Sequence, residues 1–585
     1  MKLYKLSLAL LLGAAALSSC NDKLELVNPN QQTTSTFGNT ASDLEECVIA
    51  AYNHIRMEGS YARVGYTIDL CRGDEVWNCS QVWYLGFDDL NVDAGTDILE
   101  WSWREWYYTI NVCNFITSRT EGELTDAMKR VRGQALFLRG LSYYNLAGYY
   151  QNPPLITDYS QYSSMKGLYA SSSSYDAVLE QCEADFKEAM ELLPKRDEGG
   201  EWAKGRATCG AAAGYYARTL MQRHKYEEAL VVLKDIMNSA DGGNQKYGAY
   251  KLMANYGDNF REGSAYENND ESLFEVQFLD YGTQGTDEEW TPVNTSSNAT
   301  QGHAVESNCC PGTYGGWADL AASPWLYQLF KQEKTTAGKL DPRLYWTIGT
   351  YETDWEGFEY GNVAYQSTMT ASNNVIVNTN NGGLPIAKNT NFRTGLYNSV
   401  TQGLHCGINL RMMRYADVLL RAAECENEIN GPTQQAIDWI NKVRARANLA
   451  GLQLSDFADA DALFEQIANV ERPKEFGCEF GRGFDLIRWG FFYDNDRLQQ
   501  LKEHGTFRRS ADASVAKDVV SYSDIATNSE FKSSYDTYVK GHEFLPVRQA
   551  VLNANPNLRG NSANYNSDNS VYFLGKGWTV HPVVK

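Results

Sequence analysis

Apolar residues along most of the chain recur at the spacing of amphipathic helices. Over residues 44–55, and again over 175–193, they fall three or four positions apart, and Pro194 ends the second run. Residues 42–45 read Ser-Asp-Leu-Glu, the form of a capping box, in which side chains three residues apart satisfy each other's exposed backbone amides. The pattern predicts a mostly helical protein whose first helix is capped by Ser42 and Glu45.

The predicted helices form pairs. The pairs are expected at 213–220 with 226–236, at 415–423 with 436–443, and at 136–150 with the helix that ends at Leu193. Small residues where two short antiparallel helices cross are typical of tetratricopeptide repeats, and each such pair needs a neighbour to bury its apolar face. Because the pairs lie far apart in the sequence, we expect one large domain with insertions over 42–585.

Residues 241–410 interrupt the helical pattern. Gly, Asn, Ser and Thr are abundant there, and the aromatic residues follow no period. Long segments without regular structure in a compact domain are usually functional. The expected fold is therefore mostly α, with a tetratricopeptide-like helix-pair scaffold whose long, loop-rich insertions form the ligand-binding face.

The first nineteen residues have the features of an export signal. Lys2 and Lys5 precede an apolar stretch at 6–17, and Leu-Ser-Ser stands directly before Cys20. This stretch is too short to span a bilayer core of about 30 Å but matches the core of a signal peptide. The ending resembles the lipobox of bacterial lipoproteins, although an ordinary signal with a chance cysteine would look the same. We expect a lipoprotein signal peptide at 1–19, a lipid on Cys20 and a tether over 20–41.

Composition and charge narrow the possible partners. Hydrophobic residues make up 43% and charged residues 21% of the chain, as in folded globular proteins. The formal net charge of −21 repels phosphate backbones, so nucleic acid is not an expected partner. Of the 12 cysteines, Cys20 is assigned to the lipid and the others are odd in number, so at least one thiol stays free unless it pairs between chains.

Motifs of enzymes and metal sites are absent from the sequence. No GxGxxG, Walker loop, HExxH or GxSxG occurs, and carboxylate pairs such as 74–75 are expected by chance among 73 acidic residues. Cysteines at 309–310 near His303 lack paired CxxC spacing. The calcium-like string at 91–97 lacks the terminal glutamate of an EF-hand loop, which favours a turn. We expect no catalytic residue, metal or cofactor, and we expect the alternating charges of 471–488 to form structural ion pairs.

Aromatic residues are the one enriched chemical class, at 12% of the chain. A Trp or Tyr plane can cover the apolar C–H face of a sugar ring, while Asn, Asp or Arg take its hydroxyls. Aromatic residues at helical spacing, as in 103–114 and at Trp439 and Trp489, are expected to be structural. The candidate ligand contacts lie instead in polar stretches without a period: Trp77, Trp83, Tyr84, Tyr314 and Trp317. Together, their two segments would form an aromatic platform.

Several segments together resemble the SusD/RagB family of outer-membrane nutrient-binding lipoproteins. Besides the lipobox, they are the stretches at 103–114, 139–144, 153–156, 414–420, 471–489, 544–547 and 555–558. The similarity runs from Cys20 to about Tyr565, where Asn-Ser-Ala-Asn-Tyr replaces the usual Asn-Pro-Gly-Tyr. The residues after Tyr565 are not explained by it.

The resemblance implies a single SusD-like domain with a ligand site built from variable loops. It implies a protein that is not an enzyme, lipid-anchored in the outer membrane and facing the cell exterior. Such a protein captures oligosaccharides or polysaccharides and delivers them to a SusC-like TonB-dependent transporter. Some members bind peptides, so peptide capture is the main alternative, and a glycoside hydrolase is a third. The sequence does not name the glycan.

The lipid on Cys20 can be tested directly. Replacing Cys20 by alanine removes the thiol that would be acylated, so labelling with a fatty-acid probe should be lost and the protein should leave the membrane fraction. Acyl labelling that persists in Cys20→Ala would contradict the assignment.

Overall fold

The computed structural model shows a mostly helical protein, as the sequence predicts. It describes residues 37–78, 81–240, 243–279, 302–310, 316–317, 319–349, 384–391, 406–508, 531–558 and 568–584. Cys20, the expected signal peptide, most of the expected tether and Tyr314 lie outside the described residues. Within these ranges, no helix is both long enough and apolar enough to cross a membrane.

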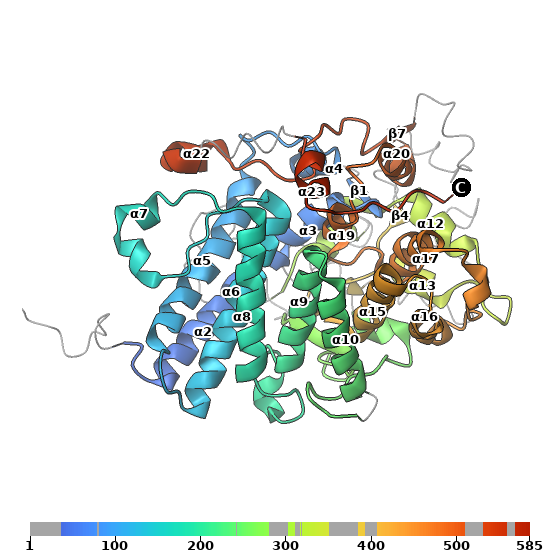
Figure 1. Ribbon diagram of the computed structural model, residues 1–585. Helices are drawn as coiled ribbons and strands as arrows, with labels where there is room; N and C mark the ends of the chain where they lie inside the picture. Colours follow the sequence, from blue (N-terminus) through green and yellow to red (C-terminus); the bar gives the residue numbers. More distant parts are fainter. Residues whose placement is uncertain are drawn as a thin grey trace, which may run out of the picture.

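Eight long helices make up the scaffold. They are α2 (Ala41–Ile55), α5 (Ile98–Arg119), α6 (Asp126–Tyr150), α8 (Tyr175–Leu192), α9 (Cys209–Gln222), α10 (Tyr226–Ala240), α15 (Tyr415–Asn430) and α16 (Gln434–Arg446). Each packs against the next in this order, so they stand side by side from α2 to α16 (Figure 1). The three helix pairs expected from the sequence are all present. α10 packs directly on α15 although the loop-rich segment separates them in the chain.

Local capping explains where several helices begin. Thr40 caps α2, with its hydroxyl accepting from the Asp43 amide (3.1 Å) and the Asp43 carboxylate accepting from the Thr40 amide (3.2 Å). The expected box at Ser42 and Glu45 is therefore wrong by two residues, because Thr40 and Asp43 supply the same three-residue spacing one half-turn earlier. Farther along, Ser323 caps α12, whose first residue is Pro324.

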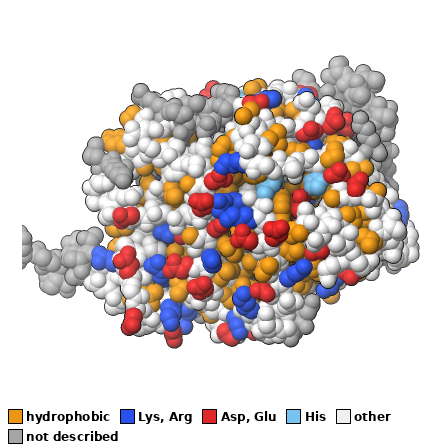
Figure 2. All heavy atoms as spheres, viewed as in Figure 1, with side chains coloured by type: hydrophobic (Ala, Val, Ile, Leu, Met, Phe, Trp, Pro, Cys, Tyr) orange, Lys and Arg blue, Asp and Glu red, His pale blue; other side chains and the backbone are white. Residues whose placement is uncertain are grey.

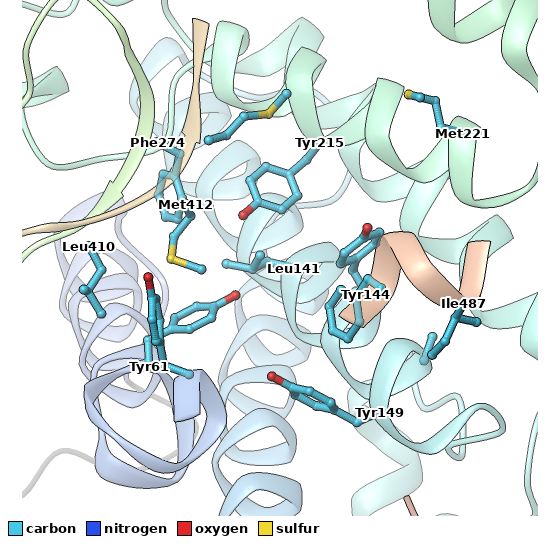
Figure 3. Packing of buried hydrophobic residues seen from close by; sticks show 14 of the residues in the cluster. Tyr61, Leu141, Tyr144, Tyr149, Tyr215, Met221, Phe274, Leu410, Met412 and Ile487 are labelled. Atoms are coloured by element: carbon cyan, nitrogen blue, oxygen red, sulfur yellow. The ribbon is translucent and has the colours of Figure 1, made fainter. Parts of the chain in front are cut away.

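The hydrophobic core lies where α6 meets its neighbours. From Val131 to its end, α6 is almost wholly buried, because other helices flank it on both sides. Figure 3 shows Leu141 and Tyr144 of α6 beside Tyr215 of α9. Gly148 lies under the Phe484 ring, and an added Cβ there would sit 2.4 Å from it, so this close approach requires glycine.

The remaining elements are short and lie mostly over one end of the scaffold. The helices are α3 (Val64–Cys71), α4 (Val82–Asp88), α7 (Met165–Leu168), α11 (Val305–Cys309), α12 (Pro324–Lys331), α13 (Pro342–Thr347), α17 (Ala460–Gln466), α18 (Arg472–Phe476), α19 (Arg482–Arg488), α20 (Asn495–His504), α22 (Gln549–Ala554) and α23 (Ser570–Leu574). The strands are β1 (Val76–Asn78), β2 (Ser272–Val276), β3 (Leu320–Ala322), β4 (Leu384–Pro385), β5 (Leu410–Arg414), β6 (Thr506–Arg508) and β7 (Phe531–Ser533). They pair as β1-β3-β4, β2-β5 and β6-β7.

A network of buried ion pairs connects these elements to the scaffold. At its centre Arg414, which is 1% exposed, contacts Glu271 (2.6 Å), Glu475 (2.9 Å) and Glu479 (2.8 Å). Arg472 bridges Asp417 of α15 (2.9 Å) to Asp485 of α19 (2.7 Å). The structural ion pairs expected in 471–488 are confirmed, although most of their partners lie far away in the sequence.

Of the residues after Tyr565, those at 568–584 are described, and they pack against the helical scaffold. The Trp578 ring stacks on His224, between α9 and α10, with 4.0 Å between ring centroids. His581 contacts Glu428 of α15 (2.8 Å) and Asp461 of α17 (2.7 Å). This segment therefore holds the ends of several helices together.

Figure 2 shows acidic and basic side chains interspersed over the long helices on the side viewed. The ten cysteines within the described ranges are free thiols, and nine of them are buried, including Cys182 and Cys425. These thiols behave as small apolar core residues.

The buried network gives a stability prediction. Arg414→Met should lower the free energy of unfolding by about 3–5 kcal/mol, because three buried carboxylates lose a shared cation. Urea unfolding at neutral pH measures the change. Lys129→Met is the control, since Lys129 and Asp126 form an exposed pair whose loss should cost about 1 kcal/mol or less. Equal effects of the two substitutions would refute the importance of the network.

Candidate aromatic ligand site

Strand pairing brings together the two aromatic segments that the sequence singled out. β1 pairs antiparallel with β3, and Trp77 lies opposite Ala321. α4, which carries Trp83, follows β1, and Trp317 stands just before β3. The backbone amide of Trp317 donates to the Ser307 carbonyl in α11 (2.6 Å). The backbone therefore brings the described parts of the two segments together around β1 and β3.

One guanidinium group lies close to both tryptophans. The Arg63 Cζ atom is 5.7 Å from the Trp83 ring centroid and 4.5 Å from that of Trp317. A cation at these distances from an aromatic face is attracted by about 0.5–2 kcal/mol, depending on its solvation. Arg63 is only 5% exposed, so these contacts are largely shielded from water. Arg63 thus links the two rings through one buried cation. We call Trp83, Arg63 and Trp317 the tryptophan–arginine cluster.

A carboxylate holds Arg63 in place. The Glu58 side chain accepts a hydrogen bond from Arg63 Nη1 (2.6 Å), and Glu58 is itself buried. Burial by itself lowers the pKa of the guanidinium, but Tyr84 and Glu58 raise it above its usual value, so Arg63 stays charged. No pattern in the sequence pointed to Arg63, because its role depends on ring contacts made by two distant segments.

The other predicted contacts have different environments. Trp83 and Trp317 are partly buried, so each presents only part of its ring to solvent. Trp77 is buried against Ala321, and Tyr84 is fully buried. A ligand cannot stack on Tyr84 in this conformation, so that assignment is corrected to a core role. The reason is that residues 82–88 form a helix, which turns Tyr84 and Phe87 inward, three residues apart.

The chain segment before Trp77 is fixed by charge. Arg482 of α19 donates to both Asp74 oxygens (2.7 and 2.8 Å), and His504 contacts one of them (2.8 Å). Burial by itself raises the pKa of Asp74, but Arg482 and His504 hold it well below its usual value. Next to it, the Glu75 carbonyl accepts from the Ser323 amide (2.7 Å). The Asp74 carboxylate and the Glu75 carbonyl together hold β1 against its neighbours.

Glu75 is protonated more readily than its neighbour. Burial, with a smaller contribution from Asp74, raises the pKa of its carboxyl to about 8 against the opposing effect of Arg482. Its side chain accepts from the Cys478 amide (3.3 Å). The pair at 74–75 is therefore part of the packing between β1 and the segment before α19.

The sequence strings that resembled metal sites have ordinary structural roles. Asp93 Oδ1 accepts from the Gly95 amide (2.6 Å), so the string at 91–97 contains the turn that was expected. The His303 ring contacts the Ile408 carbonyl (2.9 Å). Among the residues with described positions, no group of three His, Cys, Asp or Glu side chains could hold a metal ion.

Comparison with known proteins places the chain in a family. Residues 270–565 match the SusD family, and residues 22–221 match a family described as starch-binding associating with outer membrane. A SusD-like protein of Formosa agariphila is 24% identical over 527 residues, which cover 81% of this chain and 88% of that protein. A SusD-like protein of Bacteroides ovatus is 22% identical over 529 residues, or 85% of each chain.

Solved structures share the fold. A SusD-like carbohydrate binding protein from Bacteroides fragilis has a TM-score of 0.67 at 21% identity, covering 90% of this chain and 100% of its own. Surface glycan-binding protein A from Bacteroides uniformis has a TM-score of 0.62 at 20% identity, covering 89% and 99%. The family matches and these structures lead to one conclusion: the chain belongs to the SusD family.

Proposed function

We propose that this protein is a cell-surface lipoprotein that binds a glycan at the tryptophan–arginine cluster. The observation that carries the proposal is that the Arg63 guanidinium contacts both Trp83 and Trp317, two rings from distant parts of the chain. Indole rings fixed in this way can cover the apolar face of a sugar. Because the rings are already positioned by Arg63, binding costs little side-chain entropy.

The family supports a carbohydrate as the ligand. One matching family is described as starch-binding, and two structures of similar fold are named as carbohydrate-binding and glycan-binding proteins. The carboxylates at 74–75, beside the aromatic segment, contact Arg482 and backbone amides and so have a structural role. We therefore propose binding without catalysis.

The proposal includes a location on the outer membrane and a partner for transport. The signal at 1–19, the lipid on Cys20 and the tether over 20–41 would place one binding domain, 42–585, on the outer membrane facing the cell exterior. A surface protein that only binds a glycan cannot move it across the membrane. We propose that a SusC-like TonB-dependent transporter takes the glycan from it.

Calorimetry on single tryptophan variants tests the site. Trp83→Ala and Trp317→Ala should each weaken binding of the best glycan from an array by about 1–3 kcal/mol, the value of one large apolar contact. Trp346→Ala, which removes a partly buried tryptophan of α13, is the control for lost packing and should leave affinity unchanged. Melting curves must show that all three variants are folded. Unchanged affinity in both site variants, or binding of peptides and no glycans, would refute the proposal.

Co-purification tests the partner. Gentle detergent extraction of the native outer membrane, followed by capture of this protein, should recover a large β-barrel protein in a constant ratio. Capture of Cys20→Ala from the soluble fraction is the control and should recover no barrel. Recovery of the lipidated protein alone would contradict a stable complex with a transporter.

A further inference from the structure

A hollow of about 910 Å³ lies beside Trp83. It is bounded by α4, by the turn at 89–97, by the first turns of α5, and by Thr537 and Arg548. Its volume falls within the range of about 300–1,000 Å³ that is typical of small-ligand sites. Trp83 lines the hollow and also contacts Arg63, so the hollow adjoins the tryptophan–arginine cluster.

Exposed apolar side chains line part of this hollow. Val82 is 74% exposed and Leu85 is 40% exposed, although both belong to the short helix α4. Trp101, at the start of α5, adds a second indole to the lining. Exposed apolar residues are ordinary when they are scattered singly, but several on one concave surface indicate a contact site.

The polar lining has an excess of negative charge. It contains four carboxylates and two guanidinium groups, from Asp89, Asp93, Asp97, Glu100, Arg104 and Arg548. Arg548 forms ion pairs with two of these carboxylates, those of Asp97 and Glu100. Carboxylates accept hydrogen bonds from hydroxyl groups, whereas they repel uronates and sulfates. The lining therefore suits an uncharged ligand that carries hydroxyl groups and apolar C–H faces.

We propose that this hollow is a second contact region for the glycan, joined to the cluster through Trp83. The ligand is then an uncharged oligosaccharide long enough to reach both regions. This inference rests on the proposed function, because it extends the same ligand beyond the first tryptophan pair. It predicts that the affinity for the oligosaccharide rises with its number of sugar units, and that contacts in the hollow cause this rise.

Chain-length series measured by calorimetry provide the test. Short and long members of uncharged glucan, mannan, xylan and galactan series are titrated into the wild-type protein beside sulfated and uronate glycans. The double variant Val82→Glu/Leu85→Glu replaces the apolar lining with charge and should lower affinity for the long members roughly tenfold. Val231→Glu is the matched control, because Val231 is 63% exposed on α10 and does not line the hollow.

The outcomes separate the two proposals. Loss of the length-dependent gain in the double variant alone would support the hollow as a glycan contact. If the double variant binds long members as the wild type does, or if anionic glycans bind more tightly than uncharged ones, the inference is overturned while glycan binding stands. If no glycan of any length binds the wild-type protein, the proposed function fails as well.

Discussion

The position of the aromatic site depends on the ion pair between Arg482 and Asp74. This pair is buried, with Asp74 fully enclosed, and it fixes the chain just before β1. β1 then pairs with β3, which places Trp317 near Trp83. Burying a carboxylate without its cation costs free energy, so the segment around Asp74 has few alternative positions. A buried ion pair that includes neither Trp83 nor Trp317 thus helps to determine where these two rings lie.

Buried ion pairs also fix other short elements on the helical scaffold. Arg472 connects α15 to α19, while Arg414 gathers three carboxylates from two separate segments. Replacing such networks with apolar residues can leave stability unchanged, so their value here lies in specifying one arrangement. We infer that the helices supply the apolar burial and that the charges determine how the short elements sit on them. The residues around the exposed parts of Trp83 and Trp317 can then differ without any change in the helical scaffold.

Local signals explain how much of this could be predicted. The long helices were predictable because each carries its own apolar periodicity, and α12 because Ser323 and Pro324 mark its start. The start of the first helix was predicted two residues too late. Both Thr40 with Asp43 and Ser42 with Glu45 have the three-residue spacing of a capping box. Tyr84 was misassigned because α4 is too short for its period to be recognised. Arg63 could not be found, since its two ring contacts join segments that only the fold brings together.

The central claim is that a glycan lies against Trp83 and Trp317. The most direct measurement is a crystal structure of the protein soaked with the tightest-binding oligosaccharide from an array. The account predicts sugar rings stacked on both indoles, with Arg63 still in contact with both and the scaffold unchanged. A glycan bound elsewhere, with both indoles free of sugar, would contradict the account.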